Sequence, residues 1–287
     1  MLWNLVGVGQ SASFNGDGRR DVLARSFETG DLFVYPHQGR LDGLNTYGAP
    51  TKIGTGFHCG YFRWIGAGDF TGDGRADVYV TTADAKCFLY PNTAGLNDLD
   101  TLGERIHIGG KRPEVMYDSL ALADLDGDGR VDCFGRQVGT GNVDSILNTG
   151  ISGLDTWAAP EPMLTMDKTS WPIGMADVTG NGELDLIVRR DTGELALHDF
   201  FAGGKDADGR PKGAGEWYTI SRGWDGVRAI DITDIDGDGK PDLLALRVDG
   251  TLVAHVHQGV FDPERPLSTF REPVAVAVGW NDFDYIS

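Results

Sequence analysis

The chain has 287 residues, an ordinary apolar content of 40% and a net charge of −18. These values indicate a globular chain long enough to bury a sizeable core, and they exclude a disordered one. So acidic a chain is not expected to bind nucleic acid, which favours basic patches, and no apolar run approaches the ~18–20 residues of a membrane span.

One nine-residue pattern, Asp-x-(Asp/Asn/Thr)-Gly-(Asp/Asn)-Gly-x-x-Asp, recurs along the chain. In chain order its copies, loops one to five, cover residues 13–21, 69–77, 124–132, 177–185 and 234–242. Loop one begins with Ser13 in place of the aspartate. The fifth residues of successive loops are 53 to 57 residues apart. A regular period of this length over the whole chain predicts a repeat architecture.

Strand-like runs flank each loop. Runs such as 119–123 and 228–233 precede a loop, and runs such as 22–25, 78–81, 186–189 and 243–246 follow one. After a glycine-containing turn comes a third run, as at 32–35, 87–90, 195–198 and 252–255. A longer loop then leads to a fourth, as at 50–53 and 273–276. Four short strands per repeat, without helical periodicity, predict the blade of a β-propeller.

A second motif repeats in the longer loop of each unit. It reads Leu-x-Thr followed by an aromatic residue at 44–47, 154–157 and 267–270, with a weaker copy at 99–102. The fourth repeat lacks it and has a longer polar loop around 203–215 instead. Repeat four is therefore expected to be the irregular blade.

We predict an all-β fold, a single β-propeller domain over residues 1–287 with five four-stranded blades. The repeats cover approximately 5–56, 57–111, 112–166, 167–222 and 223–287. Leu5–Gly9 has the pattern of the inner strand of blade one, and Gly279–Ser287 that of the connection before it. The N- and C-terminal segments would then close the ring and leave no exposed edge. A fragment of a larger ring is the alternative.

The repeated loop has the donor pattern of a calcium site. Calcium binds six to eight oxygens, mostly from carboxylates and carbonyls. Oxygen-bearing side chains stand at positions 1, 3, 5 and 9, position 7 can offer its carbonyl, and the glycines at 4 and 6 permit a sharp turn. We expect up to five Ca²⁺ ions, held by Ser13, Asn15, Asp17, Arg19 and Asp21; Asp69, Thr71, Asp73, Arg75 and Asp77; Asp124, Asp126, Asp128, Arg130 and Asp132; Asp177, Thr179, Asn181, Glu183 and Asp185; and Asp234, Asp236, Asp238, Lys240 and Asp242.

Simple hairpin turns would also contain Asp-Gly and Asn-Gly, but they do not require the acid at position 9. Loops three and five have four carboxylates each, loop two has three, and loops one and four have two. Because ligand charge helps to set calcium affinity, loops three and five are expected to bind most tightly and loops one and four most weakly. Metal-free loops crowd like charges together, so calcium is expected to stabilise the fold.

These motifs resemble the FG-GAP/VCBS repeat family, which includes the calcium loops of integrin α-subunit propellers. The resemblance covers nearly the whole chain and implies calcium between the first two strands of each blade. Ser13 and Asn181 depart from the family's commonest aspartate. The family is largely extracellular, so the resemblance implies secretion, although no signal peptide is visible at residues 1–4. It includes protein-binding rings, lectins and domains of secreted enzymes, so the implied partners are glycans, extracellular proteins or further domains of a longer chain.

The sequence contains no hydrolase elbow, zinc-protease or phosphate-loop motif. His37 and His257 occupy equivalent places, as do His198 and His255, which favours a packing or surface role over catalysis. Arg25, Arg136 and Arg189 share one strand position and are expected to bridge blades, with a repeated binding feature as the alternative. Aromatic rings near the entry to inner strands, with polar neighbours, are candidates for stacking on a sugar, with core packing as the alternative: Phe57, His58, Trp64, Tyr117, Trp171, Trp224, Asp225, Trp280, Asn281 and Asp282.

Two functions follow from these observations. The first is a calcium-binding, non-catalytic recognition module for carbohydrate or protein. The second is an enzyme, or the accessory domain of a secreted polysaccharide-degrading lyase or hydrolase.

Overall fold

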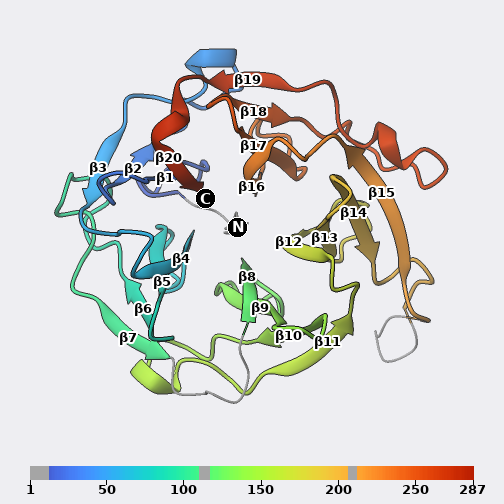
Figure 1. Cartoon of the computed structure of the whole chain (residues 1–287), viewed down its shortest axis with the longest axis horizontal. Coiled ribbons are helices and arrows are strands. Elements are labelled where there is room, and N and C mark those ends of the chain that lie inside the picture. The colour runs from blue at the N-terminus through green and yellow to red at the C-terminus, as the bar shows by residue number, and fades with distance from the viewer. Residues whose placement is uncertain (1–12, 110–116, 206–211) are drawn as a thin grey trace.

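The computed structural model describes residues 13–109, 117–205 and 212–287. Their strands form five four-stranded antiparallel sheets arranged as blades around a central axis (Figure 1). The prediction of an all-β propeller with five blades is confirmed. Apart from strands, the described residues contain four one-turn 3₁₀ segments, and none of their helices is long and apolar enough to span a membrane.

Each blade runs outward from the axis in chain order. Blade two contains β4 (Phe62–Gly68), β5 (Asp77–Thr82), β6 (Cys87–Tyr90) and β7 (Ile106–Gly109); blade three contains β8 (Tyr117–Ala123), β9 (Asp132–Gln137), β10 (Asn142–Ile146) and β11 (Glu161–Thr165). Blade four contains β12 (Ser170–Ala176), β13 (Asp185–Arg190), β14 (Glu194–Asp199) and β15 (Glu216–Arg222); blade five contains β16 (Val227–Thr233), β17 (Asp242–Arg247), β18 (Leu252–His255) and β19 (Val274–Ala277).

Blade one is assembled from both ends of the sequence. Its second to fourth strands are β1 (Val22–Ser26), β2 (Leu32–Tyr35) and β3 (Thr51–Gly54), and its inner strand is β20 (Phe283–Ile286). The expected inner strand, Leu5–Gly9, lies outside the described residues, and the segment expected to be only a connection supplies the inner strand instead. The ladder with β1 explains this, because Leu23 and Ser287 exchange two backbone hydrogen bonds of 2.8 and 2.9 Å. Closure by a terminal segment is thus correct, but the strand assignment was wrong.

The apolar core is divided among the five interfaces between neighbouring blades. Five clusters of buried side chains are each shared by two adjacent blades. Strands buried on both faces explain why runs such as Leu243–Leu246 are almost continuously apolar. The three cysteines are free thiols, Cys133 buried and the other two half-buried.

The second sequence motif forms a cover for the outer strands. In three blades its Leu-x-Thr residues make a 3₁₀ turn: η1 (Gly43–Asn45), η2 (Gly153–Asp155) and η3 (Pro266–Ser268). The threonine closes the turn, as Thr46 does by donating its hydroxyl to the carbonyl of Gly43 at 2.7 Å. Each turn packs on the outer strand of the preceding blade: η1 on β19, η2 on β7 and η3 on β15. The exposed edge of that strand is thereby shielded.

Candidate cation loops

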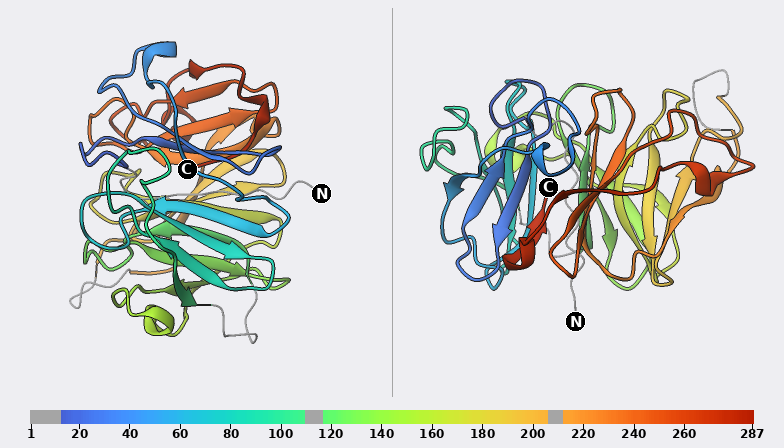
Figure 2. Two further views of the ribbon diagram at one scale, coloured as in Figure 1. Left: turned by 90° about the vertical axis from the view of Figure 1, so that its left-hand side faces the viewer. Right: turned by 90° about the horizontal axis from the view of Figure 1, so that it is seen from above.

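The repeated acidic loops occupy equivalent places in the ring. Loops two to five each join the inner strand of a blade to its second strand, and loop one leads into β1. Because every blade has the same strand order, the five loops lie at the same end of the ring. Figure 2 shows the ring from two further sides.

The ninth residue of each loop is a buried aspartate that anchors the loop to its blade. In loop two, Asp77 is fully buried and accepts hydrogen bonds from the backbone N–H of Phe70 at 3.0 Å and of Asn92 at 2.8 Å. Phe70 is the second residue of the loop, and Asn92 follows the third strand. Asp21, Asp132 and Asp242 make the same pair of bonds. This carboxylate therefore holds three parts of one blade together.

Burial makes the charge on this aspartate costly. Burial, aided by the nearby charges of Asp69 and Asp73, raises the pKa of Asp77 to about 7. The same causes act in the other loops, where the pKa reaches about 6 for Asp21 and Asp132 and about 7 for Asp185 and Asp242. A bound cation would offset this desolvation and repulsion.

The first and fifth residues shape the loop. Asp69 accepts backbone N–H groups from Gly72, Asp73 and Gly74 at 2.7 to 3.1 Å, so its carboxylate lies inside the turn. Gly72 and Gly74 have φ of +75° and +84°, a region that favours glycine. The corresponding bonds recur around Asp124 and Asp234. Local hydrogen bonding thus explains why the pattern needs both acids and glycines.

The donors in these loops suit a calcium ion. In loop three, carboxylate oxygens of Asp124, Asp126 and Asp128 all lie within 4.8 Å of one another. In loop five, those of Asp234, Asp236 and Asp242 do the same. Clustered carboxylates with spare acceptor positions are the oxygen ligands that calcium prefers. The side chain at position 7 lies near the cluster as well, since Arg75 pairs with Asp73 at 2.5 Å and Arg130 pairs with Asp128.

Four of the five loops are linked to the next blade by a residue that the sequence analysis did not single out for this role. In four blades the second residue after the third strand is histidine or asparagine, and its side chain bonds the carbonyl of the second loop residue in the preceding blade. Asn92 donates to Phe14 at 2.8 Å and Asn148 to Phe70 at 3.5 Å. His37 contacts Ile235 at 3.0 Å and His257 contacts Val178 at 3.1 Å. The sequence does contain a signal for this link, namely a histidine or asparagine followed by a glycine two or three residues later. The backbone N–H of that glycine donates a hydrogen bond to the histidine or asparagine side chain.

This link assigns a structural role to two histidines. In His37 the Nδ1 atom accepts the N–H of Gly39 at 3.0 Å, which leaves Nε2 to donate to the carbonyl of Ile235. Burial lowers the pKa of His37, in keeping with a neutral ring. His257 has the same arrangement with Gly259 and Val178. The packing role predicted for these rings is confirmed.

Comparison with known proteins agrees with this architecture. Residues 14–80 match the model of an FG-GAP-like repeat. This chain is a β-propeller that carries an FG-GAP-like repeat. No curated protein sequence matches it significantly.

Solved structures similar to the propeller include a lectin from Agrocybe aegerita described as recognising non-reducing terminal N-acetylglucosamine, with 18% identity and a TM-score of 0.46 over 94% of this chain and 66% of the lectin. This chain therefore spans just under two thirds of that relative. BBS1N in complex with ARL6DN gives 9% identity and 0.44 over 93% and 80% of the two chains. The periplasmic gluconolactonase PpgL of Pseudomonas aeruginosa gives 14% and 0.38 over 95% and 70%. At these identities and TM-scores the likenesses carry no inference about function.

Most of the aromatic rings expected to stack on a sugar are parts of the propeller core. Phe57, Trp64, Trp224 and Trp280 are at most 6% exposed. Three of them are equivalent, because the backbone N–H groups of Phe57, Trp224 and Trp280 each donate to the carbonyl of the glycine in the preceding hairpin turn, at 2.7 to 3.0 Å. Their faces pack against protein and are closed to a ligand.

The other candidates are more open but are not brought together. Trp171 is half-buried with the guanidinium of Arg136 5.0 Å from its ring, and the hydroxyl of Tyr117 donates to Asp144 at 2.8 Å. The polar candidates are exposed and lie at three separate places in the ring: His58, Asp225, and the neighbouring pair Asn281 and Asp282.

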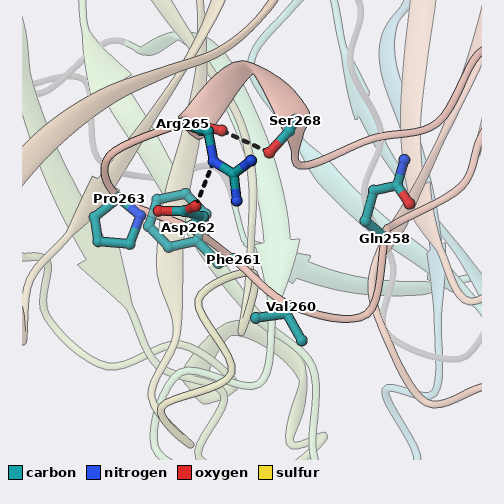
Figure 3. A pocket seen from close by; sticks show the side chains of 7 residues that line it. All are labelled: Gln258, Val260, Phe261, Asp262, Pro263, Arg265 and Ser268. Carbon is teal, nitrogen blue, oxygen red and sulfur yellow. Dashed lines mark hydrogen bonds and ion pairs between the residues drawn. The ribbon is translucent and has the colours of Figure 1, made fainter.

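A hollow that the sequence did not indicate lies in the outer loop of blade five. It has a volume of 450 Å³ and is lined by Gln258, Val260, Phe261, Asp262, Pro263, Arg265 and Ser268 (Figure 3). Arg265 pairs with Asp262 at 2.8 Å, and Ser268 donates its hydroxyl to the carbonyl of Arg265. Phe261 rests edge-on against Tyr218 of β15, so the hollow adjoins blade four.

Proposed function

We propose that this propeller is a calcium-stabilised, non-catalytic recognition module that acts outside the cell. The observation that carries the proposal is the five-fold repetition of an oxygen-rich loop around a buried aspartate. Asp77 and its counterparts are buried in sites that desolvate them, and carboxylates cluster in loops three and five. In this proposal the calcium ions are structural, because in four of the five loops the ninth aspartate ties the loop to the segment that follows the third strand of its blade.

The ligand that we propose is a carbohydrate bound at the hollow of blade five. A cavity of 450 Å³ has the size of a small-molecule site. Its lining combines an aromatic residue, Phe261, with the charged or amide groups of Gln258, Asp262 and Arg265. Such a mixture suits a sugar ring, which offers an apolar face and hydroxyls. An extracellular protein partner is the other outcome of the test.

Thermal melting tests the role of calcium. Removal of calcium with a chelator should lower the melting temperature by several degrees, and added calcium should restore it, because an ion that binds only the folded state stabilises it. Asp126→Asn should weaken the response to calcium, whereas Asp167→Asn, at an exposed acid outside the loops, should leave it unchanged. A melting temperature that changes with neither chelator nor calcium would contradict the proposal.

A glycan array with the calcium-loaded protein tests the ligand. We expect a defined set of sugars to bind without turnover, and Arg265→Ala to abolish that binding. Arg40→Ala is the matched control, because Arg40 is also an exposed arginine paired with an aspartate in an outer loop, on another blade. Cleavage of a bound glycan would favour the enzyme instead, and binding untouched by Arg265→Ala would place the ligand elsewhere.

A further inference from the structure

Blade four lacks the linking histidine or asparagine that the other four blades have after their third strands. The ladder pairs Tyr35, Tyr90, Ile146, His198 and His255 with equivalent residues of the second strands. The residue directly after each of these five is apolar in four blades, namely Pro36, Pro91, Leu147 and Val256, but it is Asp199 in blade four. The one after that is the linking histidine or asparagine in four blades but Phe200 in blade four. Blade four has therefore lost a hydrogen-bonding side chain and gained an acid.

The ninth aspartate of loop four is left with an open oxygen. Oδ2 of Asp185 accepts the backbone N–H groups of Val178 and Thr179, both at 2.9 Å. In the other four loops the second oxygen accepts an N–H from the linking residue. In loop four Oδ1 of Asp185, a fully buried residue, has no hydrogen-bond partner among the described residues. An open buried carboxylate oxygen requires a positively charged or donating group.

The added acid contacts the same loop through Asn181. Asp199 is 7% exposed, and its Oδ1 accepts the N–H of Phe201 at 2.8 Å and the side-chain amide of Asn181, the fifth loop residue, at 3.3 Å. Among the neighbouring acids, Asp199 acts more strongly on Asp185 than Asp177 does. Two buried carboxylates thus face one loop, and no described cation pairs with either of them.

We infer that loop four is a divalent-cation site in which Asp199 of β14 supplies a third carboxylate beside Asp177 and Asp185. The inference rests on the proposed calcium chemistry of the loops. The ion takes over the task of the missing backbone bond, because it joins the ninth aspartate to the end of the third strand. Loop four then has as many carboxylates as loop two, so the sequence-based expectation that it is among the weakest sites changes.

Calcium titration of the whole chain by calorimetry tests the inference, with calcium alone as the probe. Asp199→Asn keeps an oxygen for the N–H of Phe201 and removes the charge. Loss of partners outside the coordination sphere already costs ~10–100-fold in metal affinity. We therefore expect one site to be weakened by at least about tenfold while the others keep their affinities. Asp191→Asn removes an exposed acid from the same blade and should change none.

A second variant distinguishes loss of the calcium ligand from loss of folding. Asp199→Val introduces the residue that blade five has at this position, and it should also lose one calcium ion per chain while the strand pairing is retained in its circular dichroism spectrum. Variants that bind as many ions as the unaltered chain, with equal affinity, overturn the inference and leave the proposed function standing. An unaltered chain that binds no calcium overturns both.

Discussion

The aspartate at the ninth loop position serves as both anchor and charge. In four of the five loops it accepts one backbone hydrogen bond from the second loop residue and one from the residue that follows the third strand by two positions, which explains why an acid stands here even where the rest of the pattern weakens, as in loop one. The same burial that makes these bonds strong raises its pKa toward neutrality. A proton and a cation therefore compete for this carboxylate, and the competition can be measured.

The metal-free protein should lose stability as pH rises. The pKa of Asp77 is about 7 in the folded chain against an ordinary value of 3.8, so between these values the folded state binds a proton that the unfolded state has released. The stabilisation is complete below pH ~4 and is lost as pH rises through about 7. Urea unfolding of the chelated protein between pH 5 and 8 measures the fall. Calcium replaces the proton, so the affinity of the protein for calcium should rise over the same pH window. Asp77→Asn should reduce the dependence on pH of both the stability and the calcium affinity.

At the scale of the strands, an arginine in the second strand of three blades makes a further link to the next blade. Arg25, Arg136 and Arg189 reach backbone carbonyls at the start of the next blade's inner strand: Phe62, Ser170 and Val227. Arg25 also makes a two-point ion pair with Asp284 of β20, at 2.7 and 2.8 Å. The bridge predicted from their shared position is confirmed. A planar, always charged guanidinium suits this place because it serves a carboxylate and a carbonyl at once.

Arg25→Met should be strongly destabilising. The arginine is fully buried, and its removal leaves Asp284 and the carbonyl of Phe62 without their partner. Breaking one side of a buried ion pair costs about 3 kcal/mol. Arg40→Met, which breaks the exposed pair with Asp42, should cost less than about 1 kcal/mol. Denaturant unfolding compares the two, and equal losses would contradict the assigned role of Arg25.

At the scale of the whole ring, the seam between blades five and one differs from the others. Three residues before loops two, three and four stand Gly66, Ala121 and Gly174, but before loop five stands Asp231. This aspartate is buried beside Arg20, the eighth residue of loop one, where the other loops have apolar residues. Burial raises the pKa of Asp231 to about 7, and the charge of Arg20 opposes that rise. The seam between blades five and one thus contains a buried charged pair of residues, in addition to being closed by β20.

Removal of residues 283–287 should open the ring. It would expose the N–H and C=O groups of β1 that pair with β20 and leave Arg25 without Asp284. We expect the truncated chain to melt at a lower temperature and to self-associate through the free edge. Size-exclusion chromatography and calorimetry measure both effects, with Val278→Asn, at an exposed site just before β20, as a control that should behave as the unaltered chain. A monomeric truncated chain of unchanged melting temperature would show that β20 is dispensable.

The sequence by itself determined the features that depend on local chemistry. The acidic loops, the strand runs around them and the Leu-x-Thr turns repeat with a fixed period, because each blade needs the same turns and the same buried faces. The number of blades and the bridging position of Arg25 followed from that period. Tertiary structure decided what depends on contacts between distant segments. Only the ring geometry placed β20 against β1, buried the rings of Trp224 and Trp280, and brought Asp199 into contact with Asn181 of loop four. These features depend on contacts between segments that the sequence pattern does not relate.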